Sequence, residues 1–202
     1  METREELLKQ IRDEVWDLKE SPLYKYRKEN KYYPVLGEGS HNARVVFIGE
    51  APGENEAKSG RPFAGAAGKV LDQLLASIHL KREEVYIGNL VKDRPPGNRD
   101  PEPAEIELYG PFLIRQLDAI QPKVIATLGR HSLQYILQHF GAPELGQTIT
   151  KLHGKAIPVK APYGPITILP LYHPAAALYN PNLRAVQLED IKVLSGILKR
   201  KA

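Results

Sequence analysis

The 202-residue chain has no cysteine, and its one methionine is the first residue. The absence of cysteine excludes disulfides, thiolate metal sites and cysteine nucleophiles. No apolar run approaches the roughly 20 residues of a membrane-spanning helix, and the charged N-terminal stretch METREELLKQIRDEV has no signal-peptide core. We therefore expect a cytoplasmic protein.

Length and charge bound the class of protein. With 202 residues and 42% hydrophobic content, the chain is large enough for a sizeable core, and we expect residues 1–202 to form a single domain. Lys and Arg number 28 against 24 Asp and Glu, which gives a net charge of +4. This mild excess suits a polyanionic partner, and it is equally typical of a generic basic surface.

Helical and strand-like segments alternate along the chain. Apolar residues either recur at helical spacing or run continuously, as in strands that are buried on both faces. These patterns predict helices over residues 3–19, 67–78, 104–120, 130–140 and 185–199, strands over 43–49, 84–92 and 123–129, and two short strands within 155–174. The alternation indicates an α/β fold, a three-layer α/β/α sandwich around a central, mainly parallel four-stranded sheet.

Polar residues follow three of the predicted strands, after Ile48, around Asn89 and after Leu171. Ligands of open α/β sheets bind at the carboxyl ends of the strands, so we expect these three segments to meet at one edge. The first segment, GEAPG (residues 49–53), consists mainly of glycine, alanine and proline. Such residues leave backbone N–H groups accessible to a flat ligand.

Three side chains near these strand ends are candidates for binding a base, and each has an ordinary structural alternative. The ring of Phe63 suits stacking on a base, or filling the core. The amide of Asn89 can donate and accept on the Watson–Crick edge of a base, or it can cap the strand. His173 can donate to a developing anion, or it can be a loop histidine with satisfied hydrogen bonds.

Three long motifs occur in a fixed order, GEAPGENEAKSGRPFAGAAGKVLDQLL, VYIGNLVKDRPPGNRDP and YHPAAALYNPNLR. Together they resemble the family four uracil-DNA glycosylases over nearly the whole chain. The resemblance implies an enzyme that flips deoxyuridine out of DNA and hydrolyses its N-glycosidic bond, releasing uracil and leaving an abasic site. We expect a monomer that acts on uracil-containing DNA, single- or double-stranded, without metal or cofactor.

The resemblance also implies roles for the residues at the strand ends. Phe63 stacks on the pyrimidine, Asn89 reads its edge, and His173 stabilises the negative charge that develops on uracil. Glu50 orients water or stabilises the positive sugar, unless it is a salt-bridged surface glutamate. The backbone groups that contact the uracil carbonyls belong to Gly49, Glu50, Ala51 and Gly53.

Exclusion of thymine requires a group beside the C5 position, because thymine differs from uracil only by a methyl group. Glu54 or Glu56 could fill that space, and we assign Glu56. Ala51 stands where some relatives in the wider superfamily keep an aspartate, so their strongest general base is absent here. Catalysis is therefore expected to depend on leaving-group stabilisation more than on base strength.

The segment HPAAALYNPNLR resembles the family's DNA-inserting loop. The resemblance makes Leu178 an apolar wedge that fills the vacated stack, and it places Arg184 near phosphates. Lys92, Arg94 and Arg99 are further candidates for phosphate contacts, with a solvated basic loop as the alternative.

Most members of the family carry four cysteines that bind a four-iron four-sulfur cluster, and this chain has none. The corresponding positions are Leu18, Ser21, Asp93 and Tyr109. A conventional cluster is therefore excluded. We expect packing and hydrogen bonds to replace it, because tyrosines bury area while keeping a polar tip. The replacing residues would be Leu18, Tyr24, Tyr26, Tyr32, Tyr33 and Tyr109.

Two other functions compete with a monofunctional glycosylase. One is a catalytically inactive protein that binds single-stranded DNA or the uracil base. The presence of His173 argues against it, because a binder needs no leaving-group donor. The other is an unrelated nucleotide-dependent α/β enzyme, which the absence of both G-x-G-x-x-G and the P-loop lysine motif disfavours.

Overall fold

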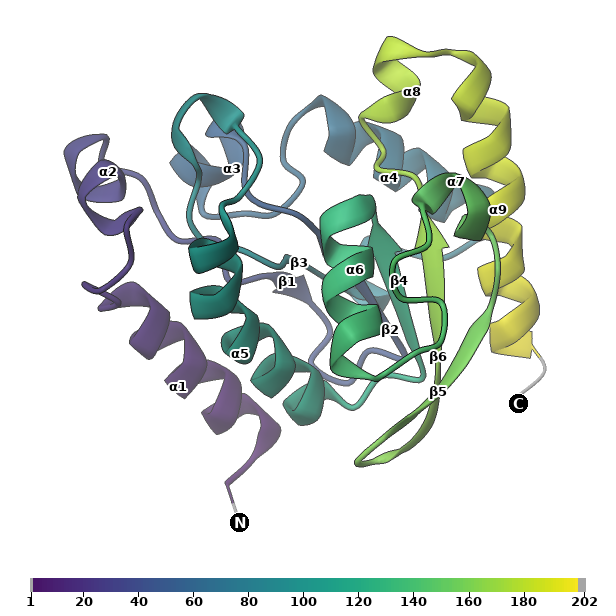
Figure 1. The fold of residues 1–202 in the computed structure, drawn as a ribbon, viewed down its shortest axis with the longest axis horizontal. Coiled ribbons are helices and arrows are strands. Elements are labelled where there is room, and N and C mark those ends of the chain that lie inside the picture. The colour runs from purple at the N-terminus through teal and green to yellow at the C-terminus, as the bar shows by residue number, and fades with distance from the viewer. Residues whose placement is uncertain (1, 200–202) are drawn as a thin grey trace.

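The buried segments of the sequence form the middle of one sheet in the computed structural model, which describes residues 2–199 (Figure 1). Four parallel strands lie in the order β3 (Tyr86–Asn89), β2 (Val45–Gly49), β4 (Val124–Leu128) and β6 (Gly164–Leu171). The edge strands, both antiparallel, are β1 (Glu38–Gly39) beside β3 and β5 (Ile157–Ala161) beside β6. The described sheet is mainly parallel as expected, but it has six strands rather than four. One of the additional strands, β1, has only two residues and so shows no strand periodicity in the sequence.

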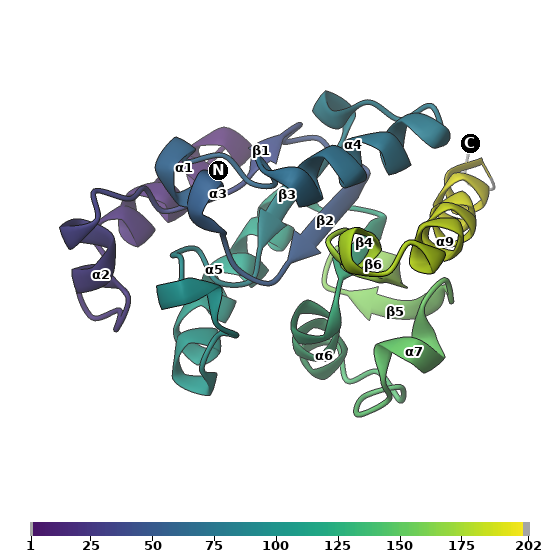
Figure 2. The ribbon, with the colours of Figure 1, turned by 90° about the horizontal axis from the view of Figure 1, so that it is seen from above.

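Alternate residues of each strand point into two hydrophobic cores. In β2, Val46 and Ile48 join one core, and Val45 and Phe47 join the other. The helices of the first core are α1 (Arg4–Trp16), α5 (Pro103–Ile120) and α6 (Arg130–His139), with α1 packed on α5. Those of the second core are α4 (Ala66–Ser77) and α9 (Asn182–Lys199). Helices therefore cover both faces of the sheet, as Figure 2 shows from above.

The long helices lie where the sequence predicts them, and their ends have local causes. At the start of α1, the Thr3 hydroxyl accepts from the Glu6 amide while the Glu6 carboxylate accepts from the Thr3 amide. Pro103 begins α5, a position where the missing N–H costs nothing. No helix within residues 2–199 is long and apolar enough to cross a membrane.

Short helical segments interrupt the predicted loops. The sequence does not predict them because four to six residues complete too few turns to show a helical period. The α-helical ones are α2 (Tyr24–Glu29), α3 (Glu54–Ser59), α7 (Ile149–Leu152) and α8 (Ala176–Tyr179). Two 3-10 turns lie at Arg82–Glu84 and Pro96–Asn98.

The register of the parallel strands brings the three polar segments to one edge. Gly49 at the end of β2 pairs with Asn89 at the end of β3. Leu128 at the end of β4 pairs with Leu171 at the end of β6. β3 and β4 lie on opposite sides of β2, so the connections leaving β2 and β4 diverge at this edge. We call the space between them the crevice, because open α/β sheets bind ligands at such switch points. The prediction that these segments converge is confirmed.

A chain of buried polar groups ties the N-terminal segment to the loop after β3. The hydroxyls of Ser21 and Tyr109 are 2.7 Å apart, and the Tyr109 hydroxyl donates to Asp93 over 2.7 Å. Arg27 donates to the second oxygen of Asp93 over 3.2 Å and also to two carbonyls at the end of α1. All four side chains are buried. Burial raises the pKa of Asp93 against the opposing effect of the Arg27 guanidinium.

The tyrosines of the N-terminal segment are not all buried as expected. Tyr109 is fully buried within the hydrogen-bonded chain. The half-buried ones are Tyr24, Tyr26 and Tyr32. The expectation is wrong for Tyr33, which is 48% exposed because its ring packs beside that of Trp16 at the surface, with centroids 6.0 Å apart.

We predict that Asp93→Ala lowers the free energy of unfolding by about 3–5 kcal/mol, because it leaves the buried Arg27 guanidinium without its charged partner. Chemical denaturation measures the change. Lys192→Ala is the control, since Lys192 pairs with Glu189 at the surface and its loss should cost less than about 1 kcal/mol. Equal effects of the two substitutions would contradict the importance of the buried pair.

Candidate functional site

Gly49 lies between an amide and an aromatic ring at the centre of the crevice. A Cβ placed on Gly49 would overlap Oδ1 of Asn89 and lie 2.8 Å from Cζ of Phe63. The side chains of Asn89 and Phe63 therefore both reach the backbone at the end of β2. Among residues 2–199, no hydrogen bond engages the Asn89 side-chain amide, although the residue is only 2% exposed. This buried amide is free to bind a ligand.

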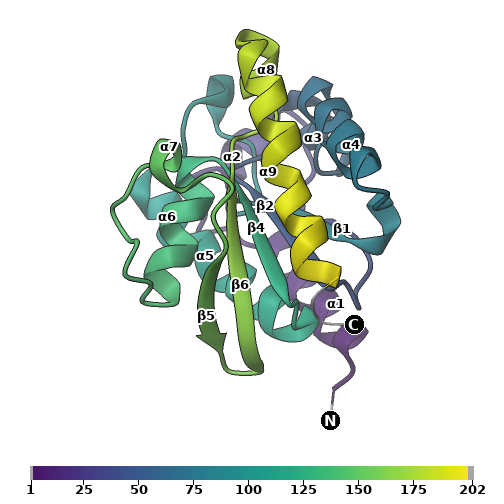
Figure 3. The same ribbon diagram turned by 90° about the vertical axis from the view of Figure 1, so that its right-hand side faces the viewer.

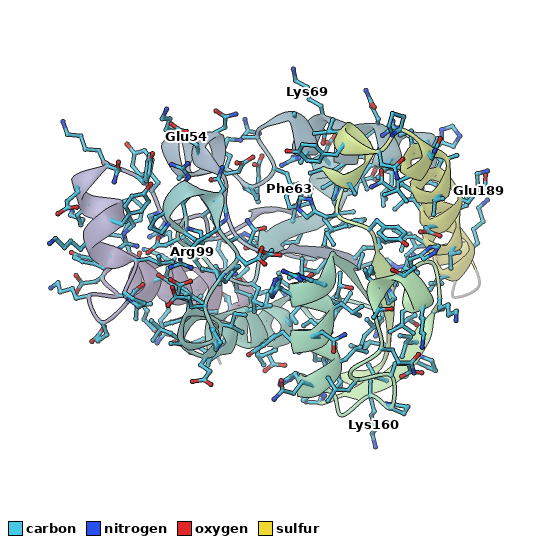
Figure 4. All side chains as sticks on the ribbon, turned by 45° about the horizontal axis from the view of Figure 1, so that its top comes forward. Glu54, Phe63, Lys69, Arg99, Lys160 and Glu189 are labelled. Carbon is cyan, nitrogen blue, oxygen red and sulfur yellow. The ribbon has the colours of Figure 1, made fainter. Side chains whose placement is uncertain are left out.

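Phe63 is held in place by its own backbone and by Glu56. Its φ of +49° lies in the left-handed region, which is uncommon for a residue with a large side chain. Immediately after it, the backbone amides of Ala64 and Gly65 donate to Oε1 of Glu56 over 2.8 and 2.9 Å. The carboxylate of Glu56 thus fixes the turn that precedes α4. In Figure 4, Phe63 lies in the middle of this end of the molecule, with Glu54 and Arg99 to one side.

His173 faces Phe63 across the crevice, with ring centroids 5.7 Å apart. The backbone amide of Ala175 donates to Nδ1 of His173 over 3.2 Å, so the proton of the neutral ring resides on Nε2. The Gln187 amide donates to the His173 carbonyl over 3.0 Å. Burial lowers the pKa of His173 to about 4. The side chain is therefore a neutral donor at physiological pH.

Glu50 lies in a small group of charged side chains. Burial raises the pKa of its carboxyl group, and the charges of His131 and Arg130 oppose this increase. Its Oε2 is 3.8 Å from Nε2 of His131. Glu50, Asp100 and His131 offer three potential ligand atoms within 4.8 Å of one another. The guanidinium of Arg130, however, contacts Asp100 and donates to His131, so a cation already occupies this group and we assign it no metal.

Lys92 is not the surface cation that the sequence suggested. Its side chain is fully buried, and its Nζ donates to the Asn89 carbonyl over 2.7 Å and to Oε1 of Gln116 over 2.6 Å. Burial lowers its pKa to about 7. A phosphate cannot reach this group, so the expected contact with DNA is wrong. Lys92 instead anchors the backbone of the residue whose amide faces the crevice.

The other basic candidates are differently engaged. Arg94 is buried and donates to the Tyr32 hydroxyl and to Asn98. Arg99 is partly exposed and forms a two-pronged pair with the buried Glu105, over 2.6 and 2.9 Å. Both arginines therefore hold the loop after β3 in place. Their contact with DNA phosphates stays a prediction.

The segment after His173 carries the remaining candidates. Leu178 in α8 is 48% exposed, and the neighbouring Tyr179 is 88% exposed. Figure 3 shows α8 projecting beyond the strand ends. Arg184, at the start of α9, donates to Gln73 of α4 over 2.6 Å. Leu178 is thus an exposed apolar side chain on a projecting segment, and its role as an inserting wedge stays a prediction.

The residues that support the site are not among those that the sequence predicted. Asp100, Arg130 and His131 surround Glu50. Gln187 donates to the His173 carbonyl, and Gln116 accepts from the Lys92 side chain that bonds the Asn89 carbonyl. Arg130 and His131 begin the helix that follows β4, so the rule that ligands lie at strand ends would have found them. Gln116 and Gln187 gave no signal, because each lies within an otherwise amphipathic helix.

Comparisons with known proteins agree with this geometry. Residues 36–192 match the family model described as the uracil DNA glycosylase superfamily. The chain belongs to this superfamily. It is similar to the type-4 uracil-DNA glycosylase of Sulfurisphaera tokodaii, with 50% identity over 92% of this chain and 82% of that protein. It is 43% identical to the type-4 enzyme of Archaeoglobus fulgidus over 97% of this chain and 96% of that protein, and 39% identical to that of Thermotoga maritima over the whole of both.

For this member of the superfamily we predict that the His173 imidazole stays neutral from pH 8 down to about pH 5. Burial places its pKa near 4, below the ordinary 6.5. An NMR titration of the histidine ring protons measures this. Because the unfolded chain binds this proton at higher pH, the contribution of His173 to stability is lost as the pH falls from 6.5 through 4. A His173 midpoint near 6.5 would contradict the prediction.

Proposed function

We propose that the protein is a uracil-DNA glycosylase, which flips deoxyuridine out of DNA and hydrolyses the bond between uracil and the sugar. The observation that carries this proposal is that an unengaged amide and an aromatic ring meet beside Gly49, and that a neutral histidine donor lies against the same ring. The type-4 relatives, at up to 50% identity, support it. We further propose that the chain acts as a cytoplasmic monomer.

Recognition of uracil rests on three groups. The ring of Phe63 stacks on the pyrimidine, and the Asn89 amide pairs with its polar edge. Backbone groups of Gly49, Ala51 and Gly53 face the carbonyl oxygens. The buried amino group of Lys92 donates to the main-chain carbonyl of Asn89, so it fixes the backbone that carries the amide. A fixed amide can separate uracil from cytosine because the two bases present opposite donors and acceptors on this edge.

Cleavage breaks the carbon–nitrogen bond, and the electron pair stays on the uracil nitrogen. His173 donates from Nε2 to the uracil oxygen that takes up this negative charge. Water adds to the sugar carbon and gives up a proton, and the Glu50 carboxylate orients that water or receives its proton. The neutral state of His173 suits this role, because hydrogen bonding to the leaving anion requires no proton transfer.

DNA is held open by the segment around α8. Leu178 fills the gap that the flipped nucleotide leaves, and Arg184 lies close enough to contact a phosphate near the lesion. Glu56 fills the space beside the C5 position of uracil, and it also fixes the turn at Phe63 through the amides of Ala64 and Gly65. A rigid pocket rejects the additional methyl group more strongly than an open one.

We propose that the buried chain through Ser21, Tyr109 and Asp93 stands in for the iron-sulfur cluster of the cysteine-bearing relatives. Three of the four corresponding positions are joined by hydrogen bonds, with Arg27 as an additional member. The fourth, Leu18, packs half-buried against the core. The chain connects α1 and the start of α2 to the loop after β3, which is the connection that a shared cluster would make.

The proposed activity is tested with a labelled oligonucleotide that contains one uracil, followed by alkaline cleavage of abasic sites. We expect the metal-free wild type to cleave, and Asn89→Ala and His173→Ala each to lose about 100- to 1000-fold in rate. Asn42→Ala serves as the control and should be unaffected, because this exposed asparagine precedes the start of β2 and the site lies at the other end of that strand. Tight binding without cleavage by the wild type would overturn the proposal in favour of an inactive binding protein.

Gly49→Ala should reduce uracil release by about 100-fold or more. The added methyl group overlaps the Asn89 amide and presses on Phe63, so both side chains must move from the positions that bind the base. Single-turnover rates measure the loss. Gly97→Ala is a matched control, because a Cβ on Gly97 meets no atom within 4 Å, although its φ of +63° imposes some backbone strain. An active Gly49→Ala variant would contradict this placement of the base.

A further inference from the structure

An aromatic and basic groove lies outside the proposed active site, beside α2. It is a hollow of about 420 Å³, and its aromatic lining includes Trp16, Tyr24 and Tyr33. Trp16 is 52% exposed and Tyr33 is 48% exposed, an unusual degree of exposure for rings of this size. The two rings also border a second hollow of about 330 Å³. The rings of Trp16 and Tyr33 thus lie between two accessible hollows.

The charge of this groove is positive. Lys28 and Lys31 line it, and among residues 2–199 neither takes part in an ion pair. The one acidic side chain in the lining, Asp17, is paired with Lys19 over 3.2 Å. The third cation of the lining, Arg27, is occupied by the buried Asp93. Two exposed lysines therefore remain to attract an anionic ligand.

The groove adjoins the segment that carries the proposed uracil pocket. The Tyr33 amide donates to the carbonyl of Ala57 in α3 over 2.8 Å. A Cβ on Gly60, at the end of α3, would lie 3.5 Å from Cβ of Tyr33. Figures 1 and 3 place α2, α3 and α8 at the end of the molecule where the parallel strands end. A strand that leaves the pocket over α3 therefore reaches Tyr33 next.

We propose that this groove binds single-stranded DNA that flanks the lesion, with bases stacked on Trp16 and Tyr33 and phosphates held by Lys28 and Lys31. Stacking surfaces combined with a positive groove are the usual means of binding single strands without sequence preference, because every base has a π-face. A basic protein partner does not fit the positive charge. The proposal rests on the proposed function only for the identity of the nucleic acid as DNA.

Trp16 is the only tryptophan of the chain, so its fluorescence reports on this groove alone. We expect uracil-free oligothymidylate to quench the emission of the full-length protein, and added salt to reverse the quenching. Tyr33→Ala should weaken binding about tenfold. Lys28→Ala combined with Lys31→Ala should reduce the slope of log K against log salt by about 1.4, the value for two phosphate contacts. Lys25→Ala, an 86% exposed lysine on the same helix that pairs with Glu29, is the matched control.

The outcomes separate this proposal from the activity. Unchanged Trp16 emission at saturating oligothymidylate would overturn it, and so would quenching that survives in both the Tyr33 and the double-lysine variants. The binding probe contains no uracil, so binding and activity are measured separately. Quenching by oligothymidylate together with no cleavage of the uracil-containing oligonucleotide would support the groove and overturn the proposed function. With the activity present, the double-lysine variant should raise KM for a long single strand and leave kcat unchanged.

Discussion

The pairing of Gly49 with Asn89 at the ends of two parallel strands is the constraint on which the rest of the site depends. A glycine at the first position lets the amide and the ring of Phe63 approach the same backbone, and any larger residue would separate them. A shift of β2 by one residue relative to its neighbours would exchange its two faces. Val46 and Ile48 would then leave the core in which they pack. Packing of the sheet therefore fixes the geometry of the pocket.

Burial of the Lys92 amino group costs the fold stability and helps to fix that geometry. No carboxylate pairs with it among the described residues, and its two acceptors are a carbonyl and an amide oxygen. A hydrophobic side chain of similar size would avoid the desolvation penalty, as replacements of buried charges commonly do. The lysine holds the Asn89 carbonyl directly, whereas an apolar residue could not. On the other side of the crevice a neutral group, the Gln187 amide, does the same for His173.

The strands and long helices could be predicted because their signals are local. The continuous run over residues 43–49 and the helical period over 104–120 each determine one element. The pocket residues Asn89 and His173 could be placed at one edge because parallel strands end together, and the long motifs gave them roles. Lys92 shows the limit of this reasoning. A lysine after a strand is ordinarily a surface cation, and only the packing of α5 over the strand end shows that it is buried. Arg27, Gln116 and Gln187 likewise depend on partners distant in sequence.

The segment from Asn89 to Arg94 explains why the N-terminal region matters to a site that it does not touch. Within six residues, Asn89 faces the crevice, Lys92 bonds to α5, Asp93 pairs with Arg27, and Arg94 bonds to Tyr32. The side chains of Lys92, Asp93 and Arg94 therefore each fix the same short loop against a different part of the chain. Arg27 also lies over the ring of Tyr24, with Cζ 4.9 Å from its centroid, and both line the groove beside α2. The contacts that hold the loop after β3 thus also shape the groove, because Arg27 both pairs with the buried Asp93 and lines this surface.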